Sequence, residues 1–195
     1  KEYLDKGKTE REFAATVEKE LVKNGFENLQ NLMDQRKKLN KGDKVYYINK
    51  HKAVACAIIG EKPIADGINM VGAHIDSPRL DIKQNPLYED SGLVLLKTHY
   101  YGGIKKYQWV AIPYSLHGVV VKADGSKVEI SIGEGENDPV FSITDLLPHL
   151  AQDQMQKKAT EVVSGEGLNL LIGSQPYDDK KVKDKIKLNI LKILN

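Results

Sequence analysis

Apolar residues near the start of the chain recur at helical spacing. They fall every four positions between Thr9 and Asn24, which predicts one apolar stripe on an amphipathic helix. Thr9 and Glu12 have the spacing of a capping box, and Gly25 is suited to the left-handed conformation that ends a helix. The residues of the stripe are Phe13, Val17 and Leu21.

Three apolar segments that suit β-strands follow this helix. Residues 45–48 and 53–59 flank a polar stretch, residues 49–52, in the manner of a hairpin. Residues 68–75 form a short apolar run of the kind that buried central strands contain. A helix, a hairpin and a buried strand in this order predict an α/β layered fold.

From about residue 92 the pattern changes to short β-rich segments separated by turns. Asp124-Gly125 lies between two of these segments and is a strong hairpin signal. This part of the chain is therefore expected to form a β-rich domain. Its predicted strands are residues 93–98, 109–114, 116–121 and 127–132.

Two further helices are expected after the β-rich segments. The first covers residues 141–155 and includes Pro148, which a helix tolerates only near its first turn. The second covers residues 182–194 and has one apolar face. That face consists of Val182, Ile186, Ile190 and Ile193.

Composition and charge are those of an ordinary globular protein. The 195 residues are 41% hydrophobic and 29% charged, with a net charge of +2 and lysines spread along the chain. This balance argues against nucleic acid or a membrane surface as a partner. No apolar run approaches the roughly 20 residues of a membrane span, and the first residues lack a signal-peptide core. A cytoplasmic protein is expected, with the single cysteine, Cys56, as an inert core thiol.

The sharpest chemical feature is a histidine and a carboxylate two positions apart, at the end of the predicted buried strand. Residues two apart on a strand point to the same face, so His74 and Asp76 can meet. A neutral imidazole is a good zinc ligand, and a carboxylate is the usual partner that orients it. On this spacing alone, a metal site and a hydrogen-bonded pair at a strand end both stay open.

The other polar motifs offer less chemistry. Residues 133–138 contain two glycines but are acidic, which argues against a phosphate-binding loop. His51 is expected to be solvated in a turn, while His99 and His117 are expected to face solvent or to form local hydrogen bonds. Ser77 precedes a proline and lacks the setting of a nucleophile.

Residues 70–89, MVGAHIDSPRLDIKQNPLYE, resemble the zinc-site signature of the aspartyl aminopeptidase/aminopeptidase I family of dinuclear zinc metallopeptidases. Upstream, residues 44–49 and 53–57 are similar to the first hairpin of that family. Downstream, residues 101–103 and 147–151 resemble landmarks of its second domain. The resemblance covers nearly the whole chain in order, and the chain resembles only the front part of such an enzyme.

The resemblance implies roles for three residues. His74 matches the first zinc ligand, and Asp76 matches the carboxylate that orients the metal centre. His149 matches a histidine of the second domain that reaches a neighbouring subunit's active site, where it helps to bind substrate or stabilises the oxyanion. The alternative for His149 is a surface histidine at the start of a helix.

The same resemblance implies a domain organisation and an activity. Residues 1–91 would open an α/β/α metallopeptidase domain, and residues 92–195 would form an inserted β-rich dimerisation domain, incomplete at its C-terminal end. Such enzymes are homododecamers that remove an acidic or neutral N-terminal residue from peptides, with two zinc ions per subunit. Cobalt or manganese can replace zinc in sites of this kind.

The chain departs from the family pattern in two respects. Residues 109–114 lack the acidic and basic residues of a Trp-Phe-Asp-Arg landmark. A dinuclear centre also needs about five or six protein ligands and a general base, and no second cluster of His, Asp and Glu follows Asp153. Two other hypotheses therefore stay open: a catalytically inactive dimerisation module of this family, and a related dinuclear aminopeptidase of the glutamyl or tetrahedral type.

Overall fold

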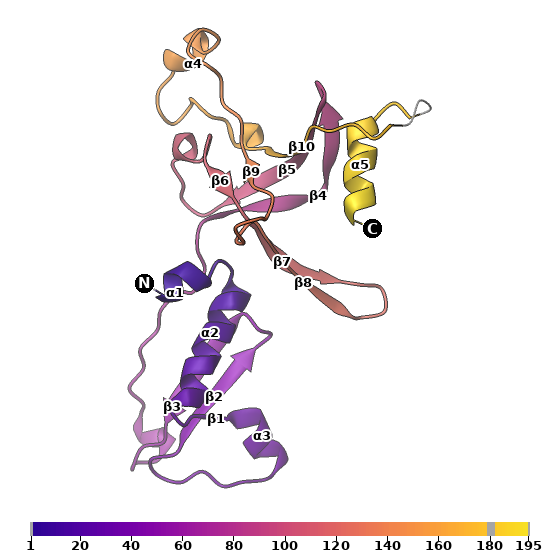
Figure 1. Cartoon of the computed structure of the whole chain (residues 1–195). Coiled ribbons are helices and arrows are strands. Elements are labelled where there is room, and N and C mark those ends of the chain that lie inside the picture. Colours follow the sequence, from indigo (N-terminus) through magenta and orange to yellow (C-terminus); the bar gives the residue numbers. More distant parts are fainter. Residues whose placement is uncertain (1, 179–181, 195) are drawn as a thin grey trace. The chain divides into compact units, whose positions relative to one another are not determined.

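The chain folds into two compact units that divide between Ser77 and Pro78. The computed structural model describes residues 2–178 and 182–194 (Figure 1). Strand β4 (Arg79–Asp90) pairs with β5 (Leu93–Tyr101) as an antiparallel hairpin, so both strands belong to the second unit. The boundary expected between residues 91 and 92 lies in the turn of this hairpin. The two compact units divide earlier in the chain, between Ser77 and Pro78.

Helix α2 (Glu10–Lys23) of the first unit begins and ends at the signals in the sequence. The Thr9 hydroxyl accepts the backbone N–H of Glu12 at 3.3 Å, and the Glu12 carboxylate accepts the backbone N–H of Thr9 at 2.9 Å. The predicted capping box is therefore confirmed. Gly25, just beyond the helix, has a φ of 80°, which is the left-handed conformation expected of it.

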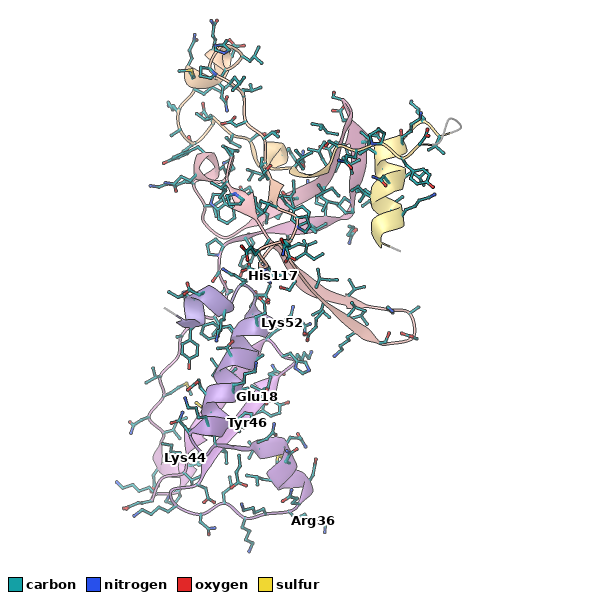
Figure 2. The ribbon with its side chains drawn as sticks, viewed as in Figure 1. Glu18, Arg36, Lys44, Tyr46, Lys52 and His117 are labelled. Atoms are coloured by element: carbon teal, nitrogen blue, oxygen red, sulfur yellow. The ribbon has the colours of Figure 1, made fainter. Side chains whose placement is uncertain are left out.

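A three-stranded sheet packs against α2 in this unit. The strand order is β1-β2-β3, with β1 parallel to β2 and the predicted β2–β3 hairpin antiparallel. Buried Tyr46 of β2 donates its hydroxyl to Glu18 of α2 at 3.0 Å, which ties the sheet to the helix (Figure 2). The bounds of the remaining elements are α1 (Glu2–Lys6), β1 (Glu27–Asn28), α3 (Leu29–Asp34), β2 (Lys44–Asn49), β3 (Ala53–Ile58) and the 3₁₀ helix η1 (Ile64–Asp66).

The prediction of a buried strand at residues 68–75 is wrong. The segment has no regular secondary structure, and Met70 and Val71 are 79% and 99% exposed. A central strand needs hydrogen-bonded neighbours, because its backbone N–H and C=O groups otherwise remain without partners. The sheet of this unit ends at β3, and no strand of the described residues pairs with this segment.

The second unit is built on a five-stranded sheet of order β4-β5-β10-β9-β6. The strands expected from the sequence do not include β4, in which residues 83–86 are polar and end in a proline. In the structure the β4–β5 register is irregular between Ile82 and Leu87, which accommodates that stretch at the edge of the sheet. The remaining strands and 3₁₀ helices are η2 (Lys106–Gln108), β6 (Pro113–Tyr114), β9 (Phe141–Ser142), η3 (Gly165–Gly167) and β10 (Leu170–Gly173).

The core of the second unit lies on this sheet. Thr98 of β5 is 2% exposed and donates its hydroxyl to the backbone carbonyl of Leu168. Trp109 and Tyr114 are partly buried and pack against the same core. Burial raises the pKa of the Tyr114 phenol to about 12. The buried members of the core are Ile143, Val163, Leu168 and Leu170.

Strands β7 (Leu116–Val121) and β8 (Lys127–Ile132) form a separate two-stranded sheet that projects from the five-stranded one (Figure 1). Its turn is closed by two backbone hydrogen bonds, Gly125 N–H to Lys122 C=O and Lys122 N–H to Ser126 C=O. The hairpin predicted from Asp124-Gly125 is confirmed.

Three predictions about the second unit need correction. Of the helix expected over residues 141–155 only α4 (Gln152–Met155) forms, because Pro148 lacks an N–H and disfavours the helical conformation of the residue before it. Of the strand expected over residues 109–114 only β6 forms. Helix α5 (Lys185–Leu194) begins three residues later than predicted, and the Ile193 side chain lies outside the described part of the chain.

The N-terminus of α5 is held by a carboxylate from a distant strand. Glu89 of β4 accepts the backbone N–H groups of Ile186 and Lys187 at 3.1 and 2.9 Å. A carboxylate at this end of a helix satisfies donors that have no partner within the helix. No helix in the described part of the chain is long and apolar enough to cross a bilayer.

Candidate functional site

His74 and Asp76 lie in contact, as the sequence predicts. Nδ1 of His74 is 3.3 Å from Oδ1 of Asp76 and 3.0 Å from the Asp76 backbone carbonyl. The contact does not arise from a shared strand face, because the segment is irregular. The His74 side chain is 85% exposed and that of Asp76 39%, so the pair faces solvent within its own unit.

This contact determines which nitrogen of His74 is suited to a metal. Since Nδ1 faces Asp76, Nε2 is the nitrogen placed to coordinate a cation. A carboxylate at the other ring nitrogen fixes the tautomer and orientation of a ligating histidine. The pair thus has the arrangement of a metal ligand with its orienting carboxylate.

The described residues do not by themselves fit a zinc centre. Catalytic zinc takes three protein ligands and keeps one position open for water or substrate. Within residues 2–178 and 182–194, no group of three or more His, Cys, Asp or Glu side chains is arranged to hold a metal ion.

His149 lies on an exposed, irregular segment of the second unit. It occupies a turn that ends before α4 begins at Gln152, so it does not stand at the start of a helix. Three leucines beside it are exposed, although they are of the residue type most often buried. The sequence pattern gives no sign of this exposure, because all three leucines fall within the predicted helix over residues 141–155. They are Leu146, Leu147 and Leu150, at 54%, 62% and 71%.

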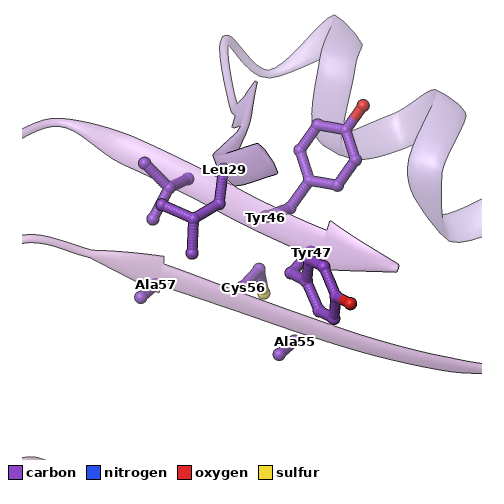
Figure 3. A pocket seen from close by; sticks show the side chains of 7 residues that line it. Leu29, Tyr46, Tyr47, Ala55, Cys56 and Ala57 are labelled. Atoms are coloured by element: carbon purple, nitrogen blue, oxygen red, sulfur yellow. The ribbon is translucent and has the colours of Figure 1, made fainter. Parts of the chain in front are cut away.

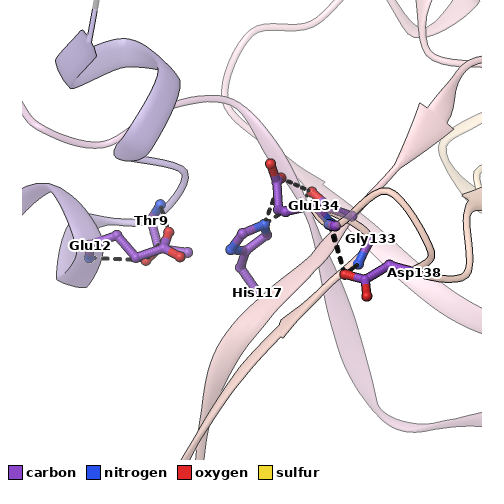
Figure 4. A network of polar contacts seen from close by, with 8 residues as sticks. Thr9, Glu12, His117, Gly133, Glu134 and Asp138 are labelled. Atoms are coloured by element: carbon purple, nitrogen blue, oxygen red, sulfur yellow. Dashed lines mark hydrogen bonds and ion pairs between the residues drawn. The ribbon is translucent and has the colours of Figure 1, made fainter.

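His117 belongs to a polar network at the base of the β7–β8 hairpin (Figure 4). Its Nε2 is 3.0 Å from both the Ser115 hydroxyl and a Glu134 carboxylate oxygen, and Ser115 donates to Glu134 at 2.7 Å. In a catalytic triad the two ring nitrogens face the hydroxyl and the carboxylate separately. Here Nε2 of His117 faces both the hydroxyl and the carboxylate, so the network is structural. The local hydrogen bonds expected of His117 are confirmed.

The acidic loop of residues 133–138 holds one of its own carboxylates, that of Asp138. Oδ2 of Asp138 accepts the backbone N–H groups of Gly133 and Gly135 at 2.9 Å and that of Glu134 at 3.2 Å (Figure 4). Successive N–H groups of this kind form an anion-binding concavity. Because the Asp138 carboxylate already occupies this concavity, the loop is not a phosphate-binding site, as the acidic sequence of residues 133–138 predicts.

This loop is expected to lose its order in acid. Hydrogen bonds from the N–H groups of Gly135, Gly133 and Glu134 lower the pKa of Asp138 from its ordinary 3.8. A carboxyl whose pKa is lower when folded stabilises the loop above pH 3.8 and loses that contribution as the pH falls through the folded value. NMR should show the Gly133 and Gly135 amide signals titrating together below pH 3.8. The Asp138→Asn variant should abolish this titration, and a midpoint at or above 3.8 would contradict the assignment.

A shallow apolar hollow lies on the β2–β3 hairpin (Figure 3). It contains no histidine or carboxylate, so it offers no acid or base for catalysis. Cys56 lines it and is exposed, which corrects the prediction of a core thiol: most of β3 is solvent-accessible at the edge of its sheet. The lining residues are Leu29, Val45, Tyr46, Tyr47, Ala55, Cys56 and Ala57.

Known proteins match this chain along its full length. Residues 3–195 match the family described as aminopeptidase I zinc metalloprotease (M18). A probable M18 family aminopeptidase 1 from Clostridium acetobutylicum is 51% identical over 195 residues, which are 100% of this chain and 42% of that protein. The chain therefore belongs to the M18 family of zinc metalloproteases.

Solved structures of family members have the same mixed α/β fold. The crystal structure of an M18 aminopeptidase from Thermotoga maritima matches with a TM-score of 0.89 and 44% identity, over 100% of this chain and 41% of that one. Aminopeptidase I from Borrelia burgdorferi B31 matches with a TM-score of 0.82 and 44% identity, over 100% and 42%. The chain thus spans about two fifths of the length of these relatives.

Proposed function

We propose that this chain is part of a zinc-dependent aminopeptidase that hydrolyses the N-terminal peptide bond of peptides with an acidic or neutral first residue. The observation that carries the proposal is the contact between His74 and Asp76, at 3.3 Å, in a chain whose residues 3–195 match a zinc metalloprotease family. The relatives named above bear the name aminopeptidase, which supports the reaction class.

Within this proposal, His74 is a metal ligand through Nε2 and Asp76 orients it. The other ligands and the general base would come from further residues of the complete protein, because the described residues contain no group of three or more side chains that could hold a metal ion. Two zinc ions per subunit, replaceable by cobalt or manganese, would polarise the peptide carbonyl in the complete site. We place the protein in the cytoplasm.

The proposal extends to assembly. Residues 92–195, which belong to the second unit, would mediate dimerisation as a domain inserted into the metallopeptidase domain, and dimers would build a homododecamer. His149 would then reach the active site of a neighbouring subunit. The exposed Leu146, Leu147 and Leu150 support this role, since a cluster of exposed apolar side chains marks a protein contact.

A test of the activity uses the complete protein and aminoacyl p-nitroanilides that begin with Asp, Glu, Ala or Leu. Removing the metal with 1,10-phenanthroline is expected to lower the rate by about 100-fold or more, because the metal activates the attacking water. Zinc, cobalt or manganese should restore the rate. N-acetylated substrates serve as the matched control, because an aminopeptidase needs the free amine. A zinc-loaded protein that cleaves none of the four substrates would favour the inactive dimerisation module.

A further inference from the structure

The β7–β8 hairpin has one face that is apolar throughout. The cross-strand register pairs Leu116 with Ile132 and Val120 with Val128, and alternate residues of each strand lie on the same face. The opposite face carries the polar and charged residues of β8. The apolar face consists of Leu116, Gly118, Val120, Val128, Ile130 and Ile132.

This apolar face is exposed toward the tip of the hairpin. Val120 is 51% exposed and Val128 is 37% exposed. Among the described residues, neither strand pairs with a third one, so both outer edges of the hairpin lack a neighbouring strand. A two-stranded hairpin alone is at best marginally stable in water. The hairpin therefore has the features of an arm that is completed by another strand.

The base of the arm is fixed, so its edge is held in a defined position. The network of His117, Ser115 and Glu134 joins the start of β7 to the residues that follow β8. Gly133 has a φ of 102°, and a Cβ there would lie 3.0 Å from Cα of Ser115. Only glycine suits this close approach, which fixes the separation of the two strands where the arm begins.

The outer edge of β8 presents both hydrogen-bonding groups and alternating charges. Backbone hydrogen bonds alternate along an antiparallel pair, and Lys122 donates to Ser126 at the turn. Following this alternation, Lys127 and Glu129 direct their backbone N–H and C=O groups away from β7. Their side chains are exposed on the same face of the strand.

We propose that β8 pairs antiparallel with β8 of a second copy of this chain, in a register centred on Val128. This register places Lys127 opposite Glu129 of the other copy, and the two-fold symmetry creates the same pair twice. A register centred on Glu129 would place like charges opposite each other, which destabilises a sheet. The result is a four-stranded sheet, β7-β8-β8-β7, with one continuous apolar face.

This inference specifies the surface for the self-association in the proposed function, and it is independent of peptide hydrolysis. The single variants Lys127→Glu and Glu129→Lys each place like charges across the pairing in the complete protein. Each is expected to weaken dimer formation about tenfold in analytical ultracentrifugation. The double variant restores opposite charges and should recover the wild-type dimer. Single variants that associate like the wild type, or a double variant that stays dissociated, would overturn the pairing.

Disulfide trapping tests the register directly. The two Val128 Cα atoms would lie about 4.5 Å apart, within reach of a disulfide, so Val128→Cys should cross-link under mild oxidation. The matched control, Ile130→Cys, places its two cysteines about 13 Å apart, and it should stay uncrosslinked. Both variants are made with Cys56, the single cysteine of this chain, replaced by serine. Equal cross-linking of both, or none at Val128→Cys, would mean that another partner or register covers this edge.

Discussion

Replacement of His74 by alanine is expected to lower peptide hydrolysis by the complete protein more than about 100-fold, while the unfolding temperature of the metal-free variant equals that of the metal-free wild type. Loss of an outer partner of a metal ligand typically costs about 10–100-fold in metal affinity or activity, so loss of the ligand itself should cost more. By the same reasoning, Asp76→Asn should lower the rate of peptide hydrolysis by about 10–100-fold. Stability should not suffer, because the His74 side chain is 85% exposed.

Two measurements give this prediction a control. Zinc per subunit, determined by mass spectrometry of the metal, should fall in the His74→Ala protein along with the rate. His51→Asn is the matched variant, because His51 is an exposed turn residue with a φ of 58°, which asparagine tolerates. It should keep full activity and metal. Wild-type turnover and zinc content in His74→Ala would rule out its assignment as a ligand.

The largest loss of stability is expected from Leu168→Ala in the core of the second unit. Leu168 is 0% exposed and belongs to the cluster with Ile143, Val163 and Leu170. Removing such a side chain leaves a cavity and costs about 2–5 kcal/mol. The Thr98 hydroxyl keeps its acceptor, because that acceptor is the backbone carbonyl of Leu168. The whole effect can thus be assigned to lost packing.

Urea unfolding of the 195-residue chain measures this loss. Trp109 is its single tryptophan and packs against the same cluster, so its fluorescence reports on this core. Leu150→Ala is the matched control, because Leu150 is 71% exposed and should change the free energy of unfolding by about 0.5 kcal/mol or less. If Leu168→Ala were as mild as Leu150→Ala, the cluster would not be the core of this unit.

Features that depend on neighbouring residues could be predicted from the sequence. The capping box of Thr9 and Glu12 and the turn at Asp124-Gly125 each arise from a few adjacent residues, and both are confirmed. Strand β4 and the helix expected over residues 141–155 could not be predicted correctly. Strand β4 forms because it pairs with β5, although its own sequence does not have the regular pattern of a strand. The helix over residues 141–155 does not form because of Pro148, although the segment contains many apolar residues.

The candidate site was predictable in part for the same reason. His74 and Asp76 are two residues apart, so their contact forms even though residues 68–75 do not form the expected strand. The exposure of the leucines beside His149 depends on what surrounds them in three dimensions, and no local pattern reveals it. Resemblance to a family could supply a role for His149, whereas spacing and composition could not.

The strand order of the second unit has a consequence during synthesis of the protein. Strand β5 lies between β4 and β10, so its second neighbour is made long after the first. Thr98 of β5 finds its acceptor only 70 residues further along the chain. At ribosomal rates of roughly 5–20 residues per second, the inner edge of the β4–β5 hairpin waits about 4–14 s for β10. During that interval the nascent chain exposes Val94, which is completely buried in the finished sheet. A chaperone that binds exposed strand edges would therefore bind the β4–β5 hairpin at this stage.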